Sequence, residues 1–380
     1  MAELMKPEQF DPTKETFEAF KKRLSPRVVV DRFDLLLEDL FLIRNPKYKF
    51  IKDYRAELAA FTEEYIGGKF PEESGVWFYF PWNSTLAHYL PAAEHLELRT
   101  ARNKYLITKE EQEKFYNAAI GIGGLSVGSH AALTINLMGG ARRIRLADPD
   151  EISASNLNRI RYSYLSLGQR KVDMVVRHIY EVDPYAEPES FGSGLTPENA
   201  EQFFEGPPKL DLLIEEMDNL EMKIRAREEA RRRRIPVIMA TDNGDGVIVD
   251  VERYDLEPDL PLFAGAAGNL TLEEFQSFPP PELPRLATKI AGPKFVAPRM
   301  LKSLPEVGKT LYSWPQLGDA ATLAGVAMSY LAKRIILGEP VASGKYEINL
   351  DAIFDSSYHD PTVAATRQAE RRAFLDTLNL

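Results

Sequence analysis

The sequence predicts an α/β protein built on a Rossmann-like, doubly wound, mostly parallel sheet with flanking helices. A smaller N-terminal α+β domain and a C-terminal crossover and helix extension complete the prediction. Three observations support it: a length of 380 residues, a globular mixture of 44% hydrophobic and 27% charged residues, and short apolar runs that alternate with helical patterns in the middle of the chain. We divide the chain into residues 1–98, 99–255 and 256–380, and we expect the last part to contain a proline-rich crossover loop and a C-terminal helix and strand that complete the fold.

The N-terminal segment, an accessory domain of residues 1–98, combines helical patterns with one aromatic run. Helices are expected over residues 15–22, 31–42 and 51–65. Residues 76–82 read V-W-F-Y-F-P-W. Aromatic and β-branched residues favour half-buried strands, so this run is predicted to be a core strand rather than the lining of a substrate pocket.

The central segment alternates strand and helix signals, which is typical of a parallel sheet covered by helices on both faces. The expected elements are, in chain order, strand 118–123, helix 129–138, strand 144–147, helix 167–182, strand 210–214, helix 220–233, strand 236–240 and strand 246–254.

The C-terminal segment opens with a proline-rich stretch and continues with one strong helix. Residues 257–305 hold enough proline to predict an irregular crossover loop. Residues 316–337 predict a helix whose small residues suit close packing against another helix. These residues are Ala320, Ala321, Ala324, Gly325 and Ala327.

Charge and composition disfavour several functional classes. Lys and Arg number 47 against 57 Asp and Glu, a net charge of −10, which argues against a nucleic-acid partner. The chain has no cysteine, which excludes disulfides, thiolate metal sites and a cysteine nucleophile. The N-terminus lacks an apolar signal core, and no stretch approaches eighteen consecutive apolar residues, so we expect a cytoplasmic protein without a membrane span.

A glycine-containing loop follows the first central strand. Residues 123–129 read G-G-L-S-V-G-S and lead into a helix, so backbone N–H groups and the helix N-terminus form a cradle for an anion. Asp148 stands twenty residues after Gly128 at the end of the next strand, where an acidic residue can accept hydrogen bonds from ribose. The pair predicts a nucleotide site, with a purely structural tight turn as the alternative.

The residues after Asp148 favour ATP over a dinucleotide. Arg159 ends the run S-N-L-N-R, Lys171 ends G-Q-R-K, and Asp218 begins D-N. Two cations and a carboxylate beside a phosphate cradle are what adenylyl transfer needs. The cations neutralise the triphosphate, and the carboxylate holds the metal that accompanies pyrophosphate. We therefore predict ATP as substrate and Mg²⁺, held by Asp218, as cofactor.

At this point the sequence resembles the ThiF/MoeB/HesA family, the bacterial relatives of ubiquitin-activating enzymes, over roughly residues 99–254. The resemblance implies an ATP-dependent adenylyltransferase that activates a carboxylate. The nucleotide-binding residues it implies are Gly123, Gly124, Gly128, Ser129, Asp148, Asp150, Asn156, Arg159 and Lys171. The catalytic residues it implies are Arg102, Arg159, Lys171 and Asp218, with Arg102 reaching the partner's ATP in a homodimer.

The sequence departs from the family pattern at the loop and in its lack of cysteine. Leu125 and Ser126 stand where glycines are usual, and the paired C-x-x-C zinc motif is missing. An acyl-adenylate would therefore meet an external nucleophile. The favoured substrate is the C-terminus of a ubiquitin-like or sulfur-carrier protein or a peptide, although a small metabolite stays open.

Two other functions remain open at this point. An NAD(P)- or FAD-dependent oxidoreductase fits the glycine loop and Asp148 but leaves Arg159, Lys171 and Asp218 unused. A non-catalytic scaffold subunit would have no need of these cations.

Overall fold

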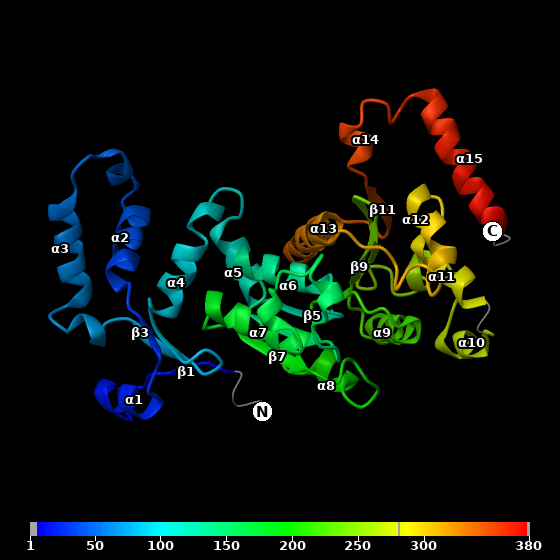
Figure 1. Cartoon of the computed structure of the whole chain (residues 1–380). Coiled ribbons are helices and arrows are strands. Elements are labelled where there is room, and N and C mark those ends of the chain that lie inside the picture. The colour runs from blue at the N-terminus through cyan, green and yellow to red at the C-terminus, as the bar shows by residue number, and fades with distance from the viewer. Residues whose placement is uncertain (1–5, 280–281, 378–380) are drawn as a thin grey trace. The chain divides into compact units, whose positions relative to one another are not determined.

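The computed structural model describes residues 6–279 and 282–377 (Figure 1). Contacts divide the chain into two compact units. The first contains residues up to 113 together with 136–139 and 176–186, and the second contains 114–135, 140–175 and the rest. Our division at residues 98 and 255 stays a prediction.

The first unit is an α+β structure with a four-stranded sheet in the order β1-β3-β4-β2. Its strands are β1 (Glu8–Gln9), β2 (Val28–Val30), β3 (Val76–Phe80) and β4 (Thr85–Tyr89). Its helices are α1 (Phe17–Leu24), α2 (Phe33–Arg44), α3 (Arg55–Ile66) and α4 (Ala92–Arg99). The aromatic run forms β3 as predicted, and Trp77, Phe78 and Phe80 are buried in the core.

The second unit contains a seven-stranded sheet in the order β11-β10-β9-β8-β5-β6-β7. Its strands are β5 (Ala119–Gly123), β6 (Arg143–Ala147), β7 (Glu187–Phe191), β8 (Leu212–Glu215), β9 (Val237–Asn243), β10 (Gly246–Glu252) and β11 (Gly344–Ile348). The neighbours from β7 to β9 pair in parallel, whereas β10 and β11 are antiparallel. The predicted mostly parallel α/β sheet is confirmed.

The two edges of this sheet are β7, which the sequence did not predict, and β11, for which it predicted a C-terminal strand without bounds. β7 reads E-P-E-S-F and β11 reads G-K-Y-E-I. Proline and charged residues are tolerated on edge strands, because one side of such a strand has no ladder to complete. The apolar signal that identifies the central strands is therefore absent at both edges.

The helices that accompany this sheet follow the predicted alternation. They are α5 (Lys109–Asn117), α6 (Gly128–Leu137), α7 (Lys171–Val182), α8 (Ala200–Glu205), α9 (Leu220–Arg232) and α13 (Gly318–Leu337). α5 and α8 were not predicted. α7 begins four residues later than expected because Gly168 adopts a positive φ of 75° just before it.

The expectation of an irregular proline-rich crossover was wrong for much of its length. Three short helices lie in it: α10 (Leu272–Ser277), α11 (Leu283–Ala291) and α12 (Pro298–Ser303). Both α11 and α12 carry proline in their first turn, where the missing N–H would have no helical partner in any case. Pro280 and Pro281 lie outside the described residues.

The small residues of α13 allow the close helix packing that the sequence predicts. A Cβ on Gly325 would lie 2.3 Å from the Cβ of His130 in α6. Within the described ranges, α13 is the one helix long and apolar enough to cross a membrane, yet 56% of that stretch is buried inside the protein. It packs against β9 and β10, as a core helix does.

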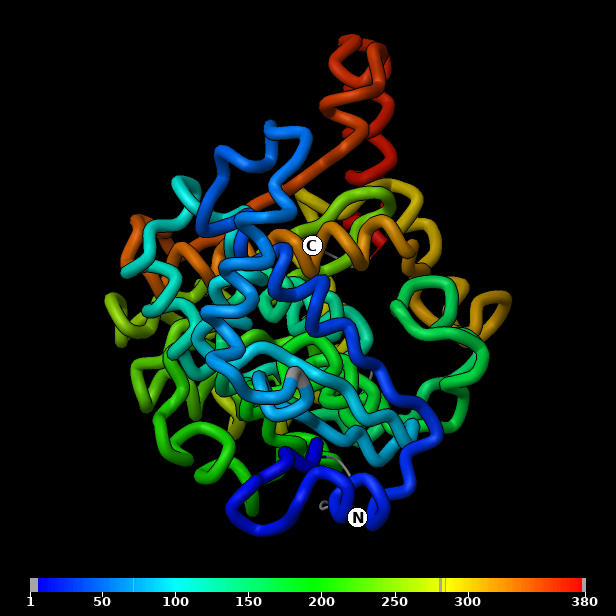
Figure 2. The backbone as a smooth tube through the Cα atoms, turned by 90° about the vertical axis from the view of Figure 1, so that its left-hand side faces the viewer, coloured from blue at the N-terminus to red at the C-terminus, as the bar shows by residue number. Residues whose placement is uncertain are grey.

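The chain ends in α14 (Asp351–Phe354) and α15 (Pro361–Thr377). Figures 1 and 2 show this red segment extending beyond β11. The last helix packs against α12, where Lys302 and Glu370 form an ion pair of 2.6 Å.

Candidate active site

A cavity of about 320 Å³ lies at the carboxyl ends of the parallel strands in the second unit. We call it the strand-end cavity. Its walls are the loop after β5 (Gly124 and Ser126), the loop after β6 (148–150), the loop after β7 (193–195) and the loop after β8 (216–219). Gly123 pairs with both Ala147 and Glu215, so three strands end at the same level. Open α/β sheets bind ligands at this position.

The glycine loop approaches the neighbouring loop so closely that only glycine fits at its second position. Gly124 has a φ of 86°, and a Cβ there would lie 2.3 Å from the carbonyl oxygen of Glu216. Gly123 ends β5 and Gly128 begins α6. Leu125 turns its side chain into the core and is 1% exposed.

Replacing Gly124 by alanine is expected to destabilise the chain by about 3 kcal/mol or more, because backbone strain and a backbone clash add together. Gly268 is a matched control, since it also has a positive φ of 72° but nothing within 4 Å of its Cβ position. Gly268→Ala should cost only about 1–2 kcal/mol. Urea unfolding of both variants measures the difference, and equal costs would contradict the proposed clash.

Asp148 ties the glycine loop to the end of β6. Its buried carboxylate accepts hydrogen bonds from the backbone N–H of Leu125 at 2.6 Å and of Asp150 at 2.8 Å. The Lys171 ammonium lies 2.8 Å from Asp150 and 3.8 Å from Asp148. Burial raises the pKa of Asp148 despite these partners. The structure thus brings the predicted Asp148, Asp150 and Lys171 together on one wall of the cavity.

Arg159 lies against the glycine loop. Its Nε donates to the Ser126 hydroxyl at 3.3 Å, and its Nη1 donates to the Ser155 carbonyl at 3.0 Å. The Asn156 side chain accepts from the Ser153 N–H, and the Asn156 carbonyl accepts from the Arg159 N–H. Asn156 therefore shapes the turn that positions Arg159.

Ser129 is turned toward the same loop, because its hydroxyl donates to the Ser126 carbonyl at 2.8 Å. The residues that line the cavity do not include five of the predicted nucleotide-binding residues: Gly123, Gly128, Ser129, Asn156 and Arg159. Their predicted contacts with the nucleotide stay predictions.

Asp218 is exposed at the mouth of the cavity, between β8 and the first turn of α9. The neighbouring Asn219 caps α9 by accepting from the Met222 N–H at 3.0 Å. Across residues 6–279 and 282–377, no group of three or more acidic or histidine side chains is arranged to hold a metal. A single carboxylate still suits Mg²⁺, which completes its octahedral shell with nucleotide phosphates and water.

Arg102 belongs to the first unit. It is exposed in the short 3-10 turn Ala101–Asn103. Its role across a dimer stays a prediction.

Residues 100–278 match the sequence profile described as the ThiF family. This segment belongs to the ThiF family. The chain is 34% identical to an uncharacterized protein of Mycobacterium tuberculosis over 328 residues, which are 86% of this chain and 45% of that protein. It is also 34% identical to the tRNA threonylcarbamoyladenosine dehydratase of Bacillus subtilis over 168 residues, which are 42% of this chain and 64% of that one. The chain therefore spans about half to two thirds of the length of these relatives.

Among solved structures, the crystal structure of the E. coli tRNA N6-threonylcarbamoyladenosine dehydratase TcdA is similar with a TM-score of 0.46 and 16% identity. The similarity covers 64% of this chain and 95% of that one.

Within the ThiF-family segment, Glu216 is a cavity residue that sequence reasoning missed. Its carboxyl accepts from the Ala240 N–H at 2.6 Å, and removal from bulk water raises its pKa well above the ordinary value. Two consecutive glutamates at the end of the apolar strand β8 were the available signal.

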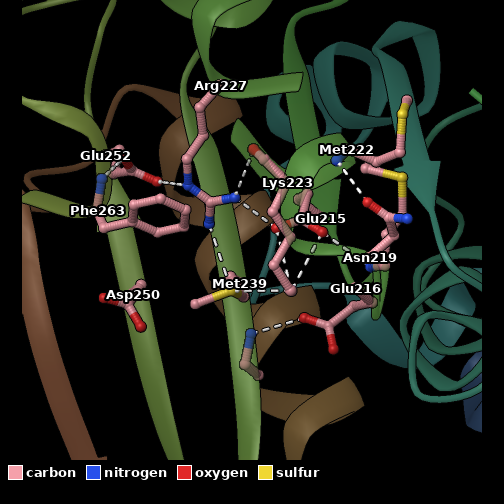
Figure 3. Close-up of polar contacts among 12 residues, drawn as sticks. Glu215, Glu216, Asn219, Met222, Lys223, Arg227, Met239, Asp250, Glu252 and Phe263 are labelled. Atoms are coloured by element: carbon pink, nitrogen blue, oxygen red, sulfur yellow. Dashed lines mark hydrogen bonds and ion pairs between the residues drawn. The ribbon is translucent and has the colours of Figure 1, made fainter. Parts of the chain in front are cut away.

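The ThiF-family segment also contains a buried ionic network centred on Arg227 (Figure 3). The fully buried Arg227 pairs with Glu215 and, at 2.7 Å, with Glu252. Its guanidinium lies 4.1 Å from the centre of the Phe263 ring. Burial alone would raise the pKa of Glu215, but Lys223 and Arg227 hold it below the ordinary value. The network fixes the end of β8 and the start of α9, between which Asp218 stands.

Asp242 on β9 is a second carboxyl that sequence reasoning missed. It is buried and accepts from the Gln316 side chain at 3.0 Å. Burial raises its pKa to about 6; Asp319 and Asp218 add to this shift, and Gln316 and Arg159 oppose it.

The raised pKa of Asp242 predicts a pH-dependent stability. The folded chain keeps this proton until about pH 6, whereas the ordinary value is 3.8, so the free energy of unfolding falls as pH rises through this window. The side chain of Asp242→Asn is neutral at every pH. The free energy of unfolding of this variant, relative to that of the parent protein, should therefore rise by about 2–3 kcal/mol between pH 4 and pH 7. Urea unfolding at both pH values measures it. A constant difference would show that the carboxyl titrates alike in both states.

Proposed function

We propose that the protein is an ATP-dependent adenylyltransferase that activates a carboxylate as an acyl-adenylate. The favoured substrate is the C-terminus of a peptide or small protein. The proposal rests on one observation: a ThiF-family segment in which the glycine loop, Asp148, Lys171 and Asp218 meet around one cavity at the strand ends. A dinucleotide enzyme would have no use for Lys171 and Asp218 at these places.

The reaction joins a substrate carboxylate oxygen to the α-phosphorus of ATP and breaks the bond from that phosphorus to the bridging oxygen. Pyrophosphate leaves with the bonding electron pair. Asp148 accepts from the ribose, since a carboxylate has room for further donors beside its two backbone partners. Lys171 exchanges Asp150 for phosphate oxygens, and Arg159 stabilises the charge that develops beside the loop.

Asp218 would hold Mg²⁺, and the bound ion would supply positive charge to neutralise the departing pyrophosphate. Arg102 serves the partner's site in a homodimer. Because the chain has no cysteine, the acyl-adenylate passes to an external nucleophile rather than to a thiol of this enzyme. We place this chemistry in the cytoplasm and away from nucleic acid and membranes.

The exchange of labelled pyrophosphate into ATP tests the proposal directly. The purified chain is incubated with Mg²⁺, ATP and a panel of peptides, C-terminal Gly-Gly proteins and small carboxylates. Exchange that depends on one of them is expected. Thermal stabilisation by NADH but not by ATP would contradict the proposal and favour the oxidoreductase, because a ligand at a hundred times its Kd stabilises by about 2.7 kcal/mol.

A further inference from the structure

A second cavity adjoins the strand-end cavity and shares Asp218 with it. Its volume is about 280 Å³, and it lies between the start of α9, strand β9 and the crossover helices α11 and α12. We call it the apolar cavity. Its outer wall is made of aliphatic and aromatic side chains: Ile290, Ala291, Val296, Leu301 and Trp314.

Two charged residues line the apolar cavity, Asp218 and Lys223, and the ammonium of Lys223 is already paired. The Lys223 ammonium lies 3.2 and 3.3 Å from the two carboxylate oxygens of Glu215 and 3.3 Å from the Met239 sulfur. Figure 3 shows Lys223 pointing toward these two partners. An anionic occupant would have to compete with Glu215 for Lys223 and would meet the carboxylate of Asp218, whereas an apolar occupant leaves the buried pair intact.

The size of the apolar cavity limits the occupant. Ligand pockets usually enclose about 300–1,000 Å³, so 280 Å³ holds one side chain or a short acyl group and no folded domain. Asp218 stands where this cavity meets the strand-end cavity. If Asp218 stands near the α-phosphate, a carboxylate attached to the occupant lies within reach of the phosphorus.

We propose that the apolar cavity binds the apolar side chain of the residue whose carboxylate is adenylated. The substrate is then a peptide that ends in an apolar residue such as leucine or phenylalanine. This inference rests on the proposed function and narrows its substrate class. A C-terminal glycine would leave the cavity empty and forgo the free energy of burying an apolar side chain.

Pyrophosphate exchange with N-acetyl dipeptides that differ only in their last residue tests the inference. We expect kcat/KM for peptides ending in Leu or Phe to exceed that for Gly by roughly ten- to a hundredfold, and a peptide ending in Asp to show no gain. The free acid 3-phenylpropanoate is a further arm. If 3-phenylpropanoate also supports exchange, the protein recognises the apolar group alone. If only the peptide supports exchange, the protein recognises the peptide backbone as well.

Cavity-filling variants provide the second half of the test. Ala291→Leu fills the wall of the apolar cavity, and Ala287→Leu fills its more exposed rim. Either change should remove the preference for Leu and Phe while ATP still raises the Tm. Lys289→Leu adds the same side chain at an exposed position of α11 outside the cavity lining and should keep the preference.

The outcomes separate this inference from the proposed function. Equal exchange with Gly, Leu and Phe would overturn the role of the apolar cavity and leave adenylation standing. A preference that survives in both filled variants would also overturn it. No exchange with any carboxylate, in a chain that binds ATP, would overturn the proposed adenylation and this inference with it.

Discussion

Asp218→Ala is expected to lower pyrophosphate exchange by on the order of a hundredfold or more, the loss found when one preorganised electrostatic group is removed from an active site. Asp218 is exposed where the two cavities meet, so the change leaves the core untouched. Exchange rates at saturating ATP, measured across a range of Mg²⁺ concentrations, give the effect. Asp218→Asn should also demand more Mg²⁺, since an amide is a weaker ligand than a carboxylate.

Asp259→Ala is the control for Asp218. Asp259 is exposed in the same unit and lines neither cavity, so its rate should stay within about twofold of the parent protein. Unchanged thermal unfolding in both variants would show that the loss is chemical. A loss of less than about threefold in Asp218→Ala would contradict the assignment of Asp218 to the metal and the α-phosphate.

Arg227→Met is expected to destabilise the chain by about 3–5 kcal/mol, because removal of one partner leaves uncompensated charge in the interior. Arg227 is completely buried between Glu215 and Glu252, and Lys223 would neutralise only the first of these. Equilibrium unfolding in urea measures the loss. ATP-dependent stabilisation should weaken as well, since the network fixes the strand end beside Asp218.

Arg232→Met is the control that distinguishes the stability cost of removing a buried arginine from the cost of removing an exposed one. Arg232 lies on the same helix with its side chain 63% exposed, and its pair with Glu229 should contribute less than about 1 kcal/mol. Adding Glu252→Gln to Arg227→Met should recover part of the stability by removing one orphaned charge. Equal costs for the two arginine variants would contradict the importance of the buried network.

The sequence predicted the centre of the second unit because local signals there agree. Strands β5, β8 and β9 are largely buried and contain apolar runs, β6 alternates arginine with apolar residues, and the glycine loop stands between a strand and a helix. These elements place Gly124, Asp148, Lys171 and Asp218 around one cavity, as their spacing along the chain predicts.

The sequence did not show where the edge strands of the sheet lie, and it did not show the helices of the crossover. Both edge strands carry charged residues, and β7 also contains a proline, so their sequences lack a clear strand pattern. The prolines of α11 and α12 looked disruptive, but they occupy first turns, where proline is tolerated. The sequence shows that proline is present but does not show whether it lies in the first turn of a helix.

By itself the sequence determined the α/β class, the glycine loop and the choice of candidate site residues, because each depends on short-range spacing. Only the tertiary structure decided the surroundings of Glu216 and Asp242, the burial of Arg227 and the apolar cavity beside Asp218. These features depend on residues far apart in the chain, such as Lys223 and Trp314, meeting around one space. The burial and desolvation of these groups arise when distant residues pack together, and the spacing of residues along the chain does not reveal which of them will do so.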